Sequence, residues 1–135
     1  MDTRDQTIRR YMQALGDADY ETIVALFTDD GMVTSPFLGT MPAGEFFEQL
    51  SRASSQNVIT PIDVMVSTSD STRGAGYFEY DWTMADGSSV VFNVVDAFTF
   101  EPGGERFASM TIIYDTHPVR EEHGDKYQQL ATDDG

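Results

Sequence analysis

The chain has no cysteine, and its basic residues include a single lysine, Lys126. Without cysteine, neither disulfides nor thiolate metal ligands can form. No apolar run approaches the roughly 20 residues that a membrane-spanning helix needs. The first residues, Met1 to Asp5, lack the basic start and apolar core of a signal peptide. We therefore expect a cytoplasmic protein with no membrane partner.

Positive charge is also scarce, because 8 basic residues face 23 acidic ones and give a formal net charge of -15. Such a surface repels the phosphates of nucleic acids, so no nucleic-acid partner is expected. Two interpretations of the acidity stay open. It provides a surface that keeps the protein soluble, or it is a halophilic adaptation to high salt, where screening removes the self-repulsion.

A length of 135 residues with 40% hydrophobic residues indicates one domain with its own core. We place this domain at residues 1–118 and a polar tail, frayed or forming a short helix, at 119–135. The spacing of Ile8, Tyr11, Met12 and Leu15 predicts a helix. A capping box formed by residues 3–6 precedes it.

Two more helices are predicted before the strands begin. Asp19 caps the second, whose apolar stripe runs from Tyr20 to Phe27 and which residues 28–31 terminate. A short strand at 32–35 follows, and Pro42 suits the first turn of the third helix.

From Val58 onward the hydrophobic period changes to two, which predicts strands. Turns at residues 69–71, 85–88 and 102–104 separate four long strands, and Asp86-Gly87 is a hairpin signal. The fold class is therefore α+β, with three N-terminal helices packed on a strongly curved antiparallel sheet that encloses a pocket. The strand from Val90 to Phe100 is apolar on both faces, which favours a homodimer through its outer face.

Apolar side chains predicted to face the helices would form the wall of this pocket. The alternative is that they simply fill the core. A mainly apolar wall with a few polar tips is typical of a site for a small hydrophobic molecule, here a flat or cyclic one that carries a carbonyl or phenol-like oxygen. The predicted substrate-binding residues are Phe27, Ser35, Phe47, Phe78, Tyr80, Trp82, Phe92, Met110, Ile112 and Tyr114, with Met84 and Val94 beside them.

Asp96 is unusual because it lies between Val94-Val95 and Ala97-Phe98, in the most apolar strand of the chain. Burial disfavours the charged form of a carboxyl group and can keep it protonated. Asp96 facing solvent, or accepting hydrogen bonds as an ionised group, is the alternative. Tyr11 lies on the apolar stripe of the first helix, and this position alone indicates an ordinary core tyrosine.

Several segments resemble the ketosteroid isomerase family and the wider nuclear transport factor 2-like superfamily, whose fold is cone-shaped. The first two helices of that family resemble residues 10–15 and 23–30, and its strand with a buried aspartic acid resembles residues 94–100. Its following hairpin resembles residues 104–110. The resemblance implies that Tyr11 and Asp96 are the catalytic pair, acting as an oxyanion hole that stabilises an enolate.

The same comparison shows departures at two positions. Ser35 stands where the family has its proton-transferring aspartate, and Phe47 stands where it often has a tyrosine. Asp115, at the end of the last strand, is a possible alternative base, although a turn residue is the simpler interpretation. Asp96 could instead be ionised and serve as the base itself, an arrangement that resembles the SnoaL-like polyketide cyclases.

The resulting hypothesis is an isomerase-like or cyclase-like enzyme that acts without a metal or other cofactor on a small hydrophobic carbonyl compound. The alternative is a non-catalytic protein of the same fold that binds a small molecule or serves as a dimerisation module.

Overall fold

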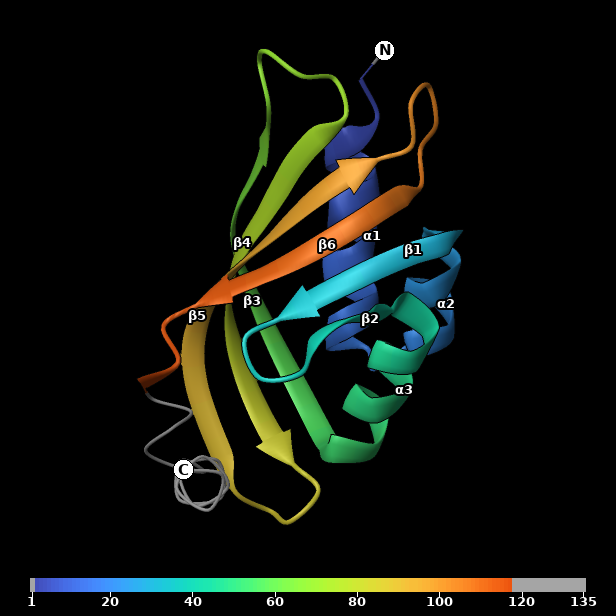
Figure 1. Ribbon diagram of the computed structural model, residues 1–135. Helices are drawn as coiled ribbons and strands as arrows, with labels where there is room; N and C mark the ends of the chain where they lie inside the picture. The colour runs from blue at the N-terminus through green and yellow to red at the C-terminus, as the bar shows by residue number, and fades with distance from the viewer. Residues whose placement is uncertain (1, 118–135) are drawn as a thin grey trace, which may run out of the picture.

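The computed structural model describes residues 2–117 of the chain, and the predicted polar tail at 119–135 lies outside them. The helices are α1 (Arg4–Gly16), α2 (Tyr20–Ala25) and α3 (Ala43–Ala53). The strands are β1 (Phe27–Ser35), β2 (Gly39–Pro42), β3 (Ser54–Val66), β4 (Arg73–Met84), β5 (Ser89–Phe100) and β6 (Phe107–Tyr114). Figure 1 shows the long strands wrapping around one side of α1, with α2 and α3 beside it. The α+β prediction is confirmed.

The six strands form one curved sheet in the order β2-β1-β6-β5-β4-β3. Neighbouring strands from β3 to β6 pair antiparallel, as the hairpin signals predict. The prediction of a wholly antiparallel sheet is wrong, however, because β1 pairs with β6 in parallel. The short β2, which the sequence analysis did not predict, pairs antiparallel with β1 at the edge of the sheet.

The predicted ends of the helices are correct in part. The Asp19 carboxylate accepts a hydrogen bond from the Thr22 backbone N–H, as expected for an N-cap. Thr3 is the N-cap residue of α1, but its side chain makes no capping bond, so the predicted capping box does not form. The second helix ends at Ala25, and Phe27 already belongs to β1.

Helix α1 is attached to the sheet at both ends. The Arg4 guanidinium Nη1 donates hydrogen bonds to the backbone carbonyls of Ser67, Asp70 and Arg73 at the β3–β4 turn, at 2.7–3.1 Å. At the other end, the Asn57 side-chain Nδ2 on β3 donates to the Leu15 carbonyl at 3.1 Å. Three of these four bonds are half-buried or buried, and together the four hold both ends of the helix against the sheet.

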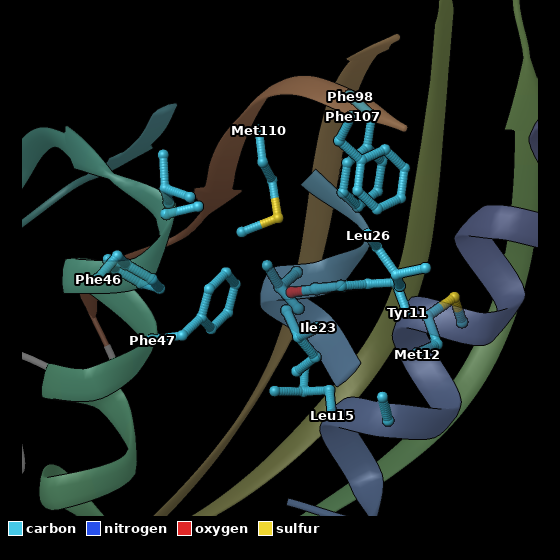
Figure 2. Packing of buried hydrophobic residues seen from close by; sticks show 14 of the residues in the cluster. Tyr11, Met12, Leu15, Ile23, Leu26, Phe46, Phe47, Phe98, Phe107 and Met110 are labelled. Carbon is cyan, nitrogen blue, oxygen red and sulfur yellow. The ribbon is translucent and has the colours of Figure 1, made fainter. Parts of the chain in front are cut away.

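The main core lies between the helices and the inner face of the sheet. Phe98 and Phe107, from neighbouring strands, stack with ring centroids 4.0 Å apart, and Tyr11 packs edge-on against Phe98 at 5.2 Å. Figure 2 shows these rings together, with Tyr11 reaching from α1 into the middle of the cluster. No helix within residues 2–117 is long and apolar enough to cross a membrane.

Candidate functional site

A cavity of about 450 Å³ lies between the inner face of the sheet, α1, α3 and the β1–β2 turn. Its lining is mainly apolar, with a small number of polar side chains, which is the usual character of a small-molecule site. The lining residues are Tyr11, Leu15, Ser35, Phe37, Leu38, Phe46, Gln49, Leu50, Ala53, Phe78, Tyr80, Trp82, Met84, Ala85, Asp86, Phe92, Val94, Asp96, Ile112 and Tyr114.

Aromatic rings from three adjacent strands form one wall of this cavity. Alternation along β4 turns Phe78, Tyr80 and Trp82 toward the same side, and Phe92 on β5 lies directly across from Tyr80. The ring centroids of Tyr80 and Trp82 are 6.0 Å apart, and those of Phe92 and Tyr114 are 4.6 Å apart. Neighbouring rings in both pairs are tilted by less than 40°. This wall presents a broad aromatic surface to a ligand.

Tyr11 and Asp96 meet in the cavity wall although they are 85 residues apart in the sequence. The Tyr11 hydroxyl donates a hydrogen bond of 2.8 Å to Oδ2 of Asp96. Each side chain is about 2% exposed to solvent. The other carboxyl oxygen, Oδ1, is buried and has no hydrogen-bond partner among the described residues. A buried carboxyl oxygen without a partner is costly in free energy and points to a role outside folding.

Burial is the main cause of the unusual electrostatics of this pair. Desolvation raises the pKa of Asp96 to about 7, against a smaller lowering effect of the hydrogen bond from Tyr11. Desolvation also raises the pKa of Tyr11 well above its usual value, with a further contribution from the Asp96 charge. Tyr11 therefore stays protonated, whereas Asp96 can change its protonation state near neutral pH.

The hydroxyl of Tyr80 is directed into a second polar network behind the aromatic wall. It donates to Oδ1 of Asn57 at 2.9 Å, and Nδ2 of Asn57 donates to the Tyr20 hydroxyl at 2.7 Å. Burial raises the pKa of Tyr80 well above its usual value. Because its hydroxyl is bonded to Asn57, Tyr80 contributes its ring to the cavity wall. Asp96 is the buried carboxyl group among the residues that line the cavity.

Three residues predicted to contact a ligand lie elsewhere. Phe27, Phe47 and Met110 do not line the cavity, and each is at most 2% exposed in the core beside it. Phe27 packs against the rings of Phe47 and Phe107, at centroid distances of 5.9 and 5.2 Å. Figure 2 shows Phe47 and Met110 within this buried cluster. On α3 it is the preceding residue, Phe46, that lines the cavity.

The other predicted wall residues, Ser35, Phe78, Tyr80, Trp82, Phe92, Ile112 and Tyr114, do line the cavity. Asp115, the possible alternative base, does not line the cavity. Its side chain is exposed, and its carboxylate accepts a hydrogen bond from the His117 backbone N–H. A carboxylate that sequence reasoning missed, Asp86, lies on the rim. Asp86 was interpreted from the sequence only as part of a hairpin turn. In the structure its side chain accepts hydrogen bonds from the backbone N–H and the hydroxyl of Ser88.

Further lining residues had no distinctive sequence signal. Phe37 and Leu38 come from the β1–β2 turn, and Gln49 and Leu50 come from α3.

Within residues 2–117, no group of three histidine, cysteine, aspartate or glutamate side chains could hold a metal ion.

The comparison with protein families matches the SnoaL-like domain to residues 8–110, which include both Tyr11 and Asp96. The chain belongs to the SnoaL-like family. A comparison with curated proteins finds no match. The resemblance seen in the sequence is thus confirmed at the level of the family.

Solved structures show the same fold as this SnoaL-like chain. An NTF2-like protein of unknown function from Burkholderia pseudomallei superposes with a TM-score of 0.75 at 20% identity, over 90% of this chain and 98% of the other. SalBIII, an epoxide hydrolase/cyclase-like enzyme with a role in pyran ring formation in the polyether salinomycin, gives 0.72 at 20% identity, over 86% and 93%. A putative SnoaL-like polyketide cyclase from Shewanella denitrificans gives 0.73 at 11% identity, over 93% and 99%.

Proposed function

We propose that this SnoaL-like protein is an enzyme that moves a proton on a small hydrophobic carbonyl compound through an enolate. Asp96 is the acid and base, and Tyr11 holds its carboxyl group in place. The observation that carries the proposal is the Asp96 carboxyl group in an apolar cavity wall, with Oδ2 bonded to Tyr11 and Oδ1 without a hydrogen-bond partner within residues 2–117.

Both protonation states of Asp96 have a chemical use. When ionised, Asp96 can accept a proton on Oδ1 from a carbon next to the carbonyl, and the Tyr11 hydroxyl, bonded to Oδ2, stabilises the carboxylate before the transfer. When protonated, it can return a proton to the substrate or donate a hydrogen bond to the enolate oxygen. A pKa of about 7 makes both states accessible near neutral pH. One carboxyl group can therefore act in both halves of a proton transfer.

This mechanism differs from the sequence-based expectation in the role of Tyr11. A tyrosine has one hydroxyl proton, and here that proton is directed at Asp96. Tyr11 is therefore a positioning residue in the proposal. Stabilisation of the substrate oxygen falls to Asp96, and the proposed site needs no separate base at Ser35.

The aromatic wall supports a flat or cyclic substrate. Rings from β4, β5 and β6 offer an extended surface on which a conjugated ring system can lie, next to Asp96. Ring closure is a reaction that such a site could serve, since the family includes proteins described as polyketide cyclases and SalBIII is cyclase-like.

The second candidate function is non-catalytic binding of the same class of molecule. Ser35 supports it, because a serine hydroxyl cannot replace a carboxylate as a base near neutral pH. Binding alone would use the cavity and its aromatic wall and would leave the protonation state of Asp96 without a chemical role.

Exchange of carbon-bound protons with deuterated solvent distinguishes these functions. Cyclic aryl ketones are incubated with the wild type, Asp96→Asn or Glu79→Gln, and the exchange is followed by proton NMR. Glu79→Gln is the control, because Glu79 is an exposed acid on the outer face of β4. The wild type and Glu79→Gln should accelerate exchange, and Asp96→Asn should lose about 100-fold or more of the rate. Equal exchange by all three proteins would contradict the enzyme proposal. Binding without any catalysed exchange would favour the binding protein.

A further inference from the structure

Helix α1, which carries Tyr11, lies close to the sheet beside Asp96, and β4 has glycines at the point of approach. Gly74 and Gly76 lie under α1, and Gly76 is buried. In the strand register, Gly76 is the direct neighbour of Asp96 on β5. The inner face of β4 therefore has no side chain beside the Asp96 carboxyl group.

Two side chains of α1 occupy the space that a side chain at position 76 would need. A Cβ atom on Gly76 would lie 3.0 Å from Cγ2 of Ile8 and 3.1 Å from Sδ of Met12. Ile8 and Met12 flank Tyr11 on the same face of the helix, one turn apart. The methionine end is flexible, whereas Cγ2 of the β-branched Ile8 is fixed close to the helix backbone. A Cβ at position 76 would thus push on the turn of α1 that carries Tyr11.

We infer that Gly76 is a positioning residue for the site: its missing side chain lets α1 come close enough to the sheet for Tyr11 to bond to Asp96. The tolerance is small, because the hydrogen bond is 2.8 Å long and bonds of this kind weaken beyond about 3 Å. The ends of α1 offer little freedom to adjust, since Arg4 and Leu15 are both bonded to the β-strand region.

The inference predicts a specific change in Asp96 when Gly76 is replaced. Among the described residues, Tyr11 from α1 and Tyr80 from β4 are titratable groups that interact with Asp96, and the hydrogen bond from Tyr11 lowers the pKa of Asp96. Moving α1 outward lengthens this hydrogen bond and weakens its lowering effect, so the pKa of Asp96 should rise. Tyr11→Phe removes the same bond completely and gives the limit of the effect.

The experiment is a titration of the buried carboxyl group without any ligand, by infrared difference spectroscopy against Asp96→Asn. Gly76→Ala should raise the titration midpoint of Asp96 by on the order of half a pH unit or more. In the Tyr11→Phe background, Gly76→Ala should add no further shift, because the bond through which it acts is already absent. Gly16→Ala is the matched control on α1, where the new Cβ would meet Ile59 at an ordinary 3.6 Å, and its midpoint should equal that of the wild type.

A compensating variant keeps the test decisive if Gly76→Ala does not fold. Ile8→Leu removes the Cγ2 methyl group at nearly constant volume, so Ile8→Leu/Gly76→Ala should fold with a midpoint close to that of the wild type. An unchanged midpoint in folded Gly76→Ala, an equal shift in the Tyr11→Phe background, or failure of the compensated variant to fold would overturn the inference.

The importance of Gly76 for catalysis rests on the proposed function, but this titration does not. If the midpoints behave as expected and proton exchange is absent, the positioning role stands and the enzyme proposal fails. If exchange depends on Asp96 and the midpoints do not move, the enzyme proposal stands and the role of Gly76 fails.

Discussion

Replacing Asp96 with asparagine should change how the stability of the protein depends on pH. The pKa of Asp96 is raised from its ordinary 3.8 to about 7, mainly by burial. Below pH ~4, the carboxyl group is protonated in both the folded and the unfolded chain, so its ionisation does not lower the free energy of unfolding there. Between pH ~4 and ~7 the unfolded chain loses the proton and the folded chain keeps it, so the free energy of unfolding falls as pH rises.

The size of this effect follows from the shift in pKa. A shift of one unit corresponds to about 1.4 kcal/mol, so the roughly three units of Asp96 remove on the order of 4 kcal/mol between pH 4 and pH 7. Asparagine keeps an acceptor for the Tyr11 hydroxyl and does not titrate. Any constant cost of its buried amide shifts the whole curve without changing its slope. The stability difference, Asp96→Asn minus wild type, should therefore grow with pH.

Urea unfolding of the two proteins at each pH from 4 to 8 measures this difference. Hydrogen bonds lower the pKa values of Asp2, Asp19 and Asp70, so these groups make the free energy of unfolding rise with pH. Both proteins contain these groups, and subtracting one stability curve from the other removes their contribution. Moderate salt limits the effect of the large net charge. A difference that is constant from pH 4 to pH 8, or that shrinks as pH rises, would refute the assignment of Asp96 as a buried carboxyl group with a raised pKa.

Two further predictions concern the core and the outer face. Phe47→Ala should lower the free energy of unfolding by about 3–5 kcal/mol, because its side chain is completely buried against other rings; urea unfolding that shows a loss below 1 kcal/mol would contradict its place in the core. Val91 and Ile113 are 51% and 53% exposed on the outer face of the sheet, and the homodimer predicted from β5 should use them. Light scattering should then find a dimer that Val91→Asp converts to a monomer, whereas a monomeric wild type would contradict the prediction.

The regular strands were predictable because their signals are local. The predicted turns at residues 69–71, 85–88 and 102–104 do separate β3, β4, β5 and β6, and the Asp86-Gly87 hairpin joins β4 to β5. The beginning of β1 was missed because Phe27 continues the apolar spacing of α2, and the acidic residues after it read as a turn. The parallel pairing of β1 with β6 joins segments about 80 residues apart, and no local pattern states which strands become neighbours.

The residues that line the cavity were predictable from the sequence only in part. Tyr11 and Asp96 were identified as a pair, and the structure joins them by a hydrogen bond. Phe46 and Phe47 illustrate the limit of the sequence. Adjacent helical residues point about 100° apart, and hydrophobicity alone does not tell which of two phenylalanines faces a cavity and which faces the core. Gly76 gave no signal at all, since its importance comes from what approaches it in three dimensions.

The binding of substituted phenols across a series of ligand pKa values, followed by fluorescence, tests most directly whether Asp96, held by Tyr11, acts on a ligand in the cavity. Trp82 is the only tryptophan of the chain and lines the cavity, so its emission reports binding there. We expect saturable binding by the wild type, an affinity that depends on the ligand pKa, and a marked weakening of that dependence in both Tyr11→Phe and Asp96→Asn. Absence of saturable binding, or the same dependence in all three proteins, would contradict the claim that Asp96, held by Tyr11, exchanges protons or hydrogen bonds with a ligand in this cavity.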